Sequence, residues 1–123
     1  MDIKTVGTGF SYDTWDKNLM YIDIVEDTNR GRIFNCYIAN YIEFNGVDDL
    51  ISKLKRLYNE LNYNIKNKYY SISEIINMTI NLSYLIRVMV FDDNKEIKGI
   101  IKDYSVGMEY EFKNEEELKK YIK

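Results

Sequence analysis

The sequence predicts an α+β fold in which antiparallel β-meanders carry helices packed on one face. Three observations predict it. Segments with strand-like alternation follow one another across short polar connections, and apolar stripes with helical spacing come after them. One arrangement of this kind also recurs later in the chain at a constant spacing. These features predict antiparallel strands in one or two sheets, arranged as two ββα-like units.

The recurrence is clearest before and within the two predicted helices. Segment 42–50 matches segment 110–118 position by position, so that Phe44 aligns with Phe112 and Leu50 with Leu118. Upstream, the strand-like segment 21–25 is matched with 86–90. Each half is expected to form a ββα-like unit, with a further short strand before its helix. Internal duplication and convergent ββα patterning both explain the match and both remain open.

The chain of 123 residues has the length of one domain, which we divide into four parts. An N-terminal arm covers residues 1–18, and the first ββα-like unit covers 19–61. A connection with a short helix occupies 62–81, and the second ββα-like unit covers 82–123.

The first unit is expected to contain two long extended segments and a helix. Alternation predicts a strand over 19–26, and the polar residues and glycine of 27–31 predict a hairpin connection. Residues 32–44 form a second extended stretch, bent at Ala39 and Asn40. A helix follows, and its apolar stripe consists of Val47, Leu50, Ile51, Leu54, Leu57, Tyr58 and Leu61.

The second unit follows a short connecting helix. Ser71 and Glu74 have the spacing of a capping box, which predicts a helix start directly after Ser71. Asn114 precedes three glutamates, a typical helix start that complements the helix dipole. The strands of this unit are predicted over 82–91, 96–104 and 108–112, with turns over 92–95 and 105–107.

Helices on one side leave the other face of the sheet to be covered, and contiguous exposed apolar surface usually marks a partner. We therefore expect a homo-oligomer. The residues that could contribute to this second face are Tyr21, Tyr37, Met89, Phe91 and Met108.

Composition favours a binding protein over an enzyme. The chain has no histidine, which removes most general-base, catalytic-triad and zinc designs, and we expect neither a metal nor a cofactor. Catalysis by paired carboxylates stays the alternative. Cys36 is the single cysteine, cannot form an internal disulfide and is expected to be a core residue of a strand.

Charge and hydropathy restrict the partners. A net charge of −3 argues against binding long nucleic acid through its backbone. No run of roughly 18 apolar residues and no signal-peptide layout is present, so neither membrane insertion nor export is expected, and we expect a cytoplasmic location.

Two arginines are candidates for binding phosphate, since a guanidinium offers a planar fork of donors. Arg87 lies within an apolar strand, where its charge needs a partner, either a carboxylate such as Asp23 or an anionic ligand. Arg56 lies on the polar face of the long helix, where a solvated surface charge is the alternative.

Arg30 and Arg32 flank Gly31 in the predicted hairpin. Such a turn could offer a backbone amide and two charges to a phosphate, and an ordinary basic turn is the alternative.

The N-terminal arm could form a ligand lid. Residues 6–15 combine two glycines with Phe10, Tyr12 and Trp15, whose rings could stack on a base. Packing of these rings onto the core of this chain or a neighbouring one is the alternative.

In length, element order and the isolated Arg56 and Arg87, the chain resembles the first type of Thoeris anti-defence protein, a family of phage counter-defence proteins. The resemblance implies sequestration of a cyclic ADP-ribose-type immune signal, and in some members of cyclic oligonucleotides, without cleavage. It implies action in the cytoplasm of an infected or lysogenic bacterial host. On this hypothesis a neighbouring protomer completes the pocket, whose contacts are Arg32, Arg56 and Arg87 for phosphates and Phe10, Tyr12 or Trp15 for the base.

A protein-binding inhibitor, such as an immunity or anti-CRISPR protein, is the main alternative. It would use an acidic, tyrosine-rich surface against a basic partner, because tyrosine is enriched at interfaces. A structural domain without a ligand is the third hypothesis.

Overall fold

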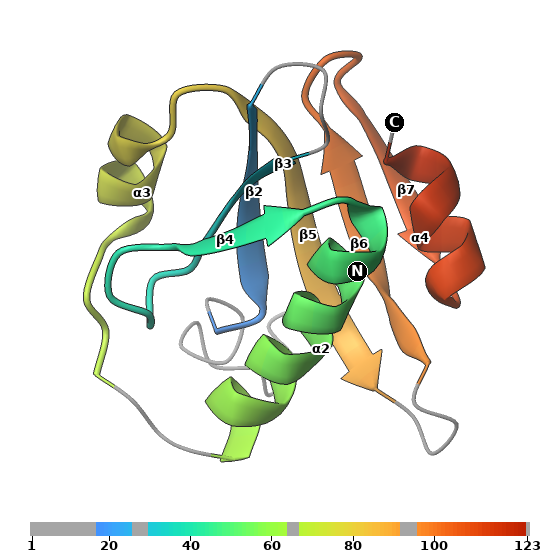
Figure 1. The fold of residues 1–123 in the computed structure, drawn as a ribbon, viewed down its shortest axis with the longest axis horizontal. Helices are drawn as coiled ribbons and strands as arrows, with labels where there is room; N and C mark the ends of the chain where they lie inside the picture. Colours follow the sequence, from blue (N-terminus) through green and yellow to red (C-terminus); the bar gives the residue numbers. More distant parts are fainter. Residues whose placement is uncertain (1–16, 26–29, 64–66, 92–95, 123) are drawn as a thin grey trace, which may run out of the picture.

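The computed structural model describes residues 17–25, 30–63, 67–91 and 96–122, and it confirms the α+β class (Figure 1). Its strands form one antiparallel sheet in the order β4-β3-β2-β5-β6-β7. The strands are β2 (Leu19–Val25), β3 (Arg30–Phe34), β4 (Ile42–Asn45), β5 (Leu82–Phe91), β6 (Ile97–Asp103) and β7 (Met108–Phe112). The helices are α2 (Val47–Tyr63), α3 (Ile72–Met78) and α4 (Glu115–Tyr121).

Helices α2 and α4 cover the core face of the sheet. Figure 1 shows α2, in green, crossing in front of the strands, and α4, in red, beside β6 and β7. Leu50, Leu54 and Leu57 of α2 are fully buried, as is Leu118 of α4. None of the helices in the described ranges is long and apolar enough to cross a membrane.

The two halves of the sheet have the same strand register. Gly31 pairs with Phe44 in the first half, and Gly99 pairs with Phe112 in the second, in agreement with the predicted alignment of the two phenylalanines. On their other sides, Gly31 pairs with Ile24 and Gly99 with Val88. Each half is therefore a three-stranded meander followed by a helix.

The match of 21–25 with 86–90 is wrong by one position. Because Ile24 and Val88 pair with equivalent glycines, these two residues are equivalent, whereas the predicted match aligns Ile24 with Met89. Two apolar segments of similar composition do not reveal their register, which depends on pairing and on which residues face the core.

A pseudo-twofold axis relates the halves and passes between β2 and β5. Met20 pairs with Ile86, and Ile22 pairs with Tyr84. With Ile24 aligned to Val88, Ile86 is the equivalent of Ile22, and Tyr84 that of Met20. Tyr21 and Leu85 are equivalent to each other and form a pair, so the axis lies between them.

The two helices that follow the meanders begin in the same way. The Asn45 N–H donates to the Asp49 carboxylate at 2.8 Å, and at the equivalent position the Lys113 N–H donates to Glu117 at 2.7 Å. The predicted caps are confirmed as well. Ser71 and Glu74 form a complete capping box, and Asn114 accepts from the Glu117 N–H.

The predicted hairpin over 27–31 is wrong at its end, because Arg30 and Gly31 belong to β3. Pairing with strands on both sides keeps this segment extended despite its glycine and its charge. The two arginines therefore flank a strand glycine and not a turn.

The predicted extended stretch over 32–44 is two strands separated by a folded segment. Asn35 starts a turn by accepting from the Tyr37 N–H at 2.7 Å, and Asn40 has a φ of 61°. Cys36 lies in this segment and is buried, so its predicted place in a strand is wrong.

Both tyrosines predicted for a partner face belong to the core. Tyr21 and Tyr37 are buried, because the segment after β3 and the region of α3 cover that half of the second face. Met89 and Met108 are exposed as predicted, and the side chain of Phe91 lies outside the described residues.

Candidate functional site

A hollow of about 370 Å³ lies beside β3, β4 and the first turns of α2. We call it the arginine hollow. Its charged side chains are Arg30, Arg32, Glu43, Asp49 and Lys53. Three cations and two carboxylates thus face one space that is open to solvent.

Arg32 is held in place from within the chain. Its guanidinium forms an ion pair with the buried Asp23 and lies over the rings of Phe34 and Tyr41, 5.2 and 5.0 Å from their centroids. Its Nε makes no hydrogen bond within the described ranges. This arrangement fixes the plane of the guanidinium and leaves part of its donor capacity unused.

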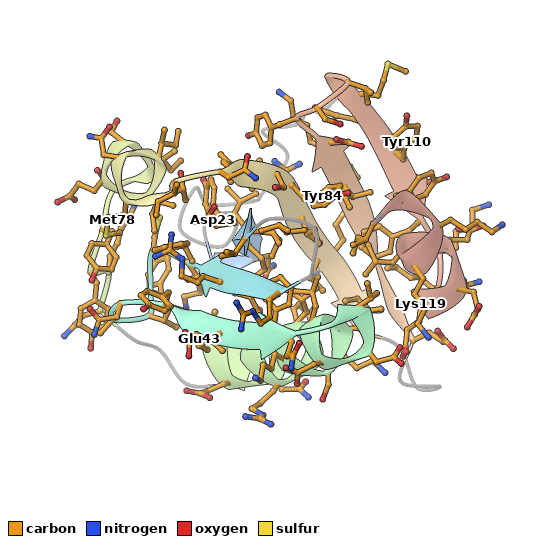
Figure 2. The ribbon with its side chains drawn as sticks, turned by 45° about the horizontal axis from the view of Figure 1, so that its top comes forward. Asp23, Glu43, Met78, Tyr84, Tyr110 and Lys119 are labelled. Carbon is orange, nitrogen blue, oxygen red and sulfur yellow. The ribbon has the colours of Figure 1, made fainter. Side chains whose placement is uncertain are left out.

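Asp23 is the anchor of this arrangement. Its side chain is 1% exposed, and its carboxylate also accepts the backbone N–H groups of Ile80 at 3.1 Å and Asn81 at 2.6 Å. Figure 2 shows Asp23 in the part of the sheet nearer α3, well away from Tyr110 of β7. Asp23 therefore neutralises Arg32, and the prediction that it could neutralise Arg87 is wrong.

Lys53 is positioned by strand β4 and by its own helix. Its Nζ donates to the Glu43 carbonyl at 2.6 Å and to the Asp49 carboxylate at 3.0 Å. The Asn45 N–H, followed by Lys53, holds the pKa of Asp49 below its ordinary value. Asp49 thus remains ionised and keeps the ammonium group at the hollow.

The lowered pKa of Asp49 predicts a pH effect. The ionised carboxylate stabilises the fold above its unfolded pKa, and this contribution is lost as the pH falls through the lower folded pKa. Wild type should therefore lose more stability than Asp49→Asn as the pH falls below about 4. Urea midpoints at several pH values measure the difference, and equal losses in both proteins would contradict the prediction.

The second half of the molecule has a cation at only one of the three equivalent positions. At the equivalent positions Arg30 is replaced by Lys98, Arg32 by Ile100 and Lys53 by Tyr121. Tyr121 stacks on Tyr110 with centroids 4.4 Å apart. The repeated scaffold therefore does not need cations at the positions of Arg32 and Lys53, and these two additional cations in the first half point to a role beyond the fold.

Arg87 lies in a much smaller hollow of about 40 Å³, with Leu85, Ile100, Lys102 and Glu109. Burial lowers the pKa of its guanidinium, and the negative charge of Glu109 acts in the opposite direction. This space is too small for a nucleotide, since pockets for small ligands have volumes of about 300–1,000 Å³. Arg87 has a negative charge from its own chain beside it.

Arg56 is exposed on α2. Arg87 alternates along β5 with the buried Ile86 and Val88 and so faces away from the core that α2 covers. One protomer therefore does not bring Arg56 and Arg87 together. Phe10, Tyr12 and Trp15 lie outside the described residues, and their contact with a base stays a prediction.

No group of three or more histidine, cysteine, aspartate or glutamate side chains in the described part of the chain could hold a metal ion. Sequence reasoning found Arg30 and Arg32 but missed Lys53 and Glu43, because these come from separate elements. A position-by-position comparison of the halves would have shown the excess of cations in the first.

Comparison with protein-family models, curated proteins and solved structures finds no match. The function of the site must therefore follow from its own chemistry.

Proposed function

We propose that the protein binds a small phosphorylated nucleotide in the arginine hollow and holds it without cleaving it. The ligand would be a cyclic ADP-ribose-type signal, and the protein would act in counter-defence by sequestering it. One observation carries the proposal: Arg30, Arg32 and Lys53 converge on a hollow of about 370 Å³. That volume lies within the range of about 300–1,000 Å³ that is usual for small-ligand pockets.

The cations of the hollow suit a phosphate. A guanidinium can donate two parallel hydrogen bonds to phosphate oxygens, and an ammonium adds a point charge. Arg32 is positioned by its ion pair with Asp23 and by two aromatic rings, and Lys53 is positioned by its ion pair with Asp49. Such preorganisation lowers the entropy that binding must overcome.

The carboxylates of the hollow limit the charge of the ligand. With Asp23 paired to Arg32, the carboxylates of Asp23, Glu43 and Asp49 balance the three positive charges, which favours a ligand with one or two phosphates over a long polyanion. Asp49 is already engaged as an acceptor by Asn45 and Lys53. Its position fits holding a cation better than taking a proton from a substrate, which supports binding without turnover.

Calorimetry with cyclic ADP-ribose and with a cyclic dinucleotide tests the proposal. We expect binding by wild type and at least about tenfold weaker binding by Arg30→Ala and by Lys53→Gln, a loss of about 1.4 kcal/mol or more. Lys98→Ala is the matched control, because Lys98 is the equivalent of Arg30 in the second half. The nucleotide affinity of Lys98→Ala should equal that of wild type.

Two results would contradict the proposal. Wild type that binds neither nucleotide would reject sequestration, and a stable protein partner in a pull-down would then favour the inhibitor hypothesis. If Arg56→Ala and Arg87→Ala abolish binding while Arg30→Ala retains it, the ligand lies at the pair predicted from the sequence. The mass of the nucleotide-bound protein would show whether an oligomer forms the site.

A further inference from the structure

A second hollow, of about 330 Å³, lies between the start of β5 and the end of β6. We call it the Asp103 hollow, and its polar residues include Asn81, Ser83, Asp103 and Ser105. Asp103 is only 8% exposed. Its Oδ1 accepts the Ser105 N–H at 2.9 Å and the Ser105 hydroxyl at 2.7 Å, whereas its Oδ2 accepts no hydrogen bond from the described residues.

The first half of the molecule has an asparagine at the equivalent position. Asn35 follows Gly31 at the same spacing at which Asp103 follows Gly99, and its Oδ1 makes the same turn by accepting the Tyr37 N–H. Its Nδ2 donates to two carbonyl oxygens, of Lys17 at 2.9 Å and of Leu19 at 3.0 Å. The amide group of Asn35 thus joins the start of β2 to the end of β3.

The second half has no such donor. With the first strands aligned through Ile24 and Val88, Lys17 and Leu19 correspond to Asn81 and Ser83, and both of these line the Asp103 hollow. Where Asn35 has an NH₂ group, Asp103 has a carboxylate oxygen, which when ionised can only accept. A nearly buried carboxylate is costly unless a cationic donor is paired with it. Asp103 Oδ2 therefore has no donor among the described residues, and a cationic N–H donor would complement it.

Two exposed apolar residues are next in sequence to residues that line the hollow. Ile80, next to Asn81, is 86% exposed, and Val106, next to Ser105, is 60% exposed. A polar group recessed beside exposed apolar side chains is typical of a protein interface. The Asp103 hollow and the arginine hollow share no lining residue. The Asn81 N–H donates to Asp23, the partner of Arg32, but the hydrogen bonds of the Asp103 side chain are to Ser105, so Asp103→Asn tests this hollow separately.

We propose that the Asp103 hollow receives a lysine or arginine side chain of a partner protein. Its ammonium or guanidinium group pairs with Asp103 Oδ2, and the apolar neighbours of that residue contact Ile80 and Val106. The net charge of −3 favours a basic partner. This surface is separate from the proposed nucleotide site and does not depend on it.

Titration of the full chain with the peptide acetyl-Leu-Lys-Leu-amide, followed by amide NMR shifts, tests the inference. We expect saturable shifts at Asn81, Ser83 and Ser105. The same peptide with norleucine or glutamine in place of lysine should bind at least about tenfold more weakly, because it lacks the charge. Equal binding of the three peptides would overturn the proposal, and so would a failure of the lysine peptide to shift these amides.

Asp103→Asn is the decisive variant, because it installs the residue found in the first half. It should reduce binding of the lysine peptide at least about tenfold without lowering the urea midpoint, since an amide can still form the turn. The reciprocal Asn35→Asp should lower the midpoint, because it removes two buried donors. Unchanged peptide binding by Asp103→Asn would overturn the inference.

Two further measurements separate this surface from the nucleotide site and from a metal site. Nucleotide binding in the arginine hollow should be the same in Asp103→Asn and in wild type, so that failure of one proposal leaves the other intact. Calcium chloride added in place of the peptide should not shift these amides. Saturable shifts with calcium would assign the hollow to a metal ion and reject the side-chain partner.

Discussion

Replacing Asp23 with alanine is expected to lower the free energy of unfolding by about 3–5 kcal/mol, the usual cost of breaking a buried ion pair by removing one partner. The substitution leaves the partly buried Arg32 guanidinium without its carboxylate. It also removes the acceptor of the Ile80 and Asn81 N–H groups, which tie the end of α3 and the start of β5 to β2. Urea unfolding followed by circular dichroism measures the loss.

Two variants make this prediction specific. Glu43→Ala removes the exposed carboxylate of the residue that pairs with Arg32 across the sheet, and its effect should stay within about 0.5 kcal/mol. Asp23→Asn keeps the shape of the side chain but loses its charge. Its free energy of unfolding should lie between those of Asp23→Ala and wild type. An Asp23→Ala protein as stable as Glu43→Ala would show that the ion pair is not a structural anchor.

Gly99→Ala should destabilise the protein by about 3 kcal/mol, at the upper end of the usual cost of overpacking. A Cβ at this position would overlap the carbonyl oxygen of Arg87 and would lie 3.0 Å from Cζ of Phe112. A backbone atom cannot rotate away as a side chain can, so β5 and β6 would have to separate locally. Chemical denaturation measures the effect.

The equivalent glycine and a turn glycine serve as comparisons. At Gly31 a Cβ would overlap the Asp23 carbonyl oxygen, so Gly31→Ala should be destabilising to a similar degree. Gly107 has a φ of +72° and nothing within 4 Å of its Cβ position. Because asparagine tolerates that conformation, Gly107→Asn should cost less than about 1 kcal/mol. If the three variants have equal stability, the close approach of neighbouring strands does not explain why glycine occupies positions 31 and 99.

Local signals made most of the fold predictable. The helix starts at Ser71 and Asn114 follow from capping chemistry, and the alternation of Leu82–Phe91 predicted a strand with those bounds. The errors occurred where tertiary pairing outweighed local preference. Gly31 lies in a strand because β2 and β4 pair with it on either side, and composition alone does not reveal that pairing.

The candidate site was only partly predictable. Arg30 and Arg32 are close in the sequence and were noticed together, whereas Lys53 reaches the hollow through the start of α2. The choice of Asp23 as a partner for Arg87 failed because sequence reasoning could not tell which arginine lies opposite it in the sheet; Arg87 pairs with Leu19 instead. That depended on the pairing of β2 with β3, which places Arg32 directly opposite Asp23.

The pairing of Tyr21 with Leu85 has a consequence for folding kinetics. Each meander can form from hairpins whose strands are neighbours in sequence, but the central strands come from distant parts of the chain, and closing the long loop between them costs chain entropy. The transition state should therefore contain the β2–β5 junction. Destabilising substitutions there should slow folding, whereas those at the outer strands should mainly speed unfolding.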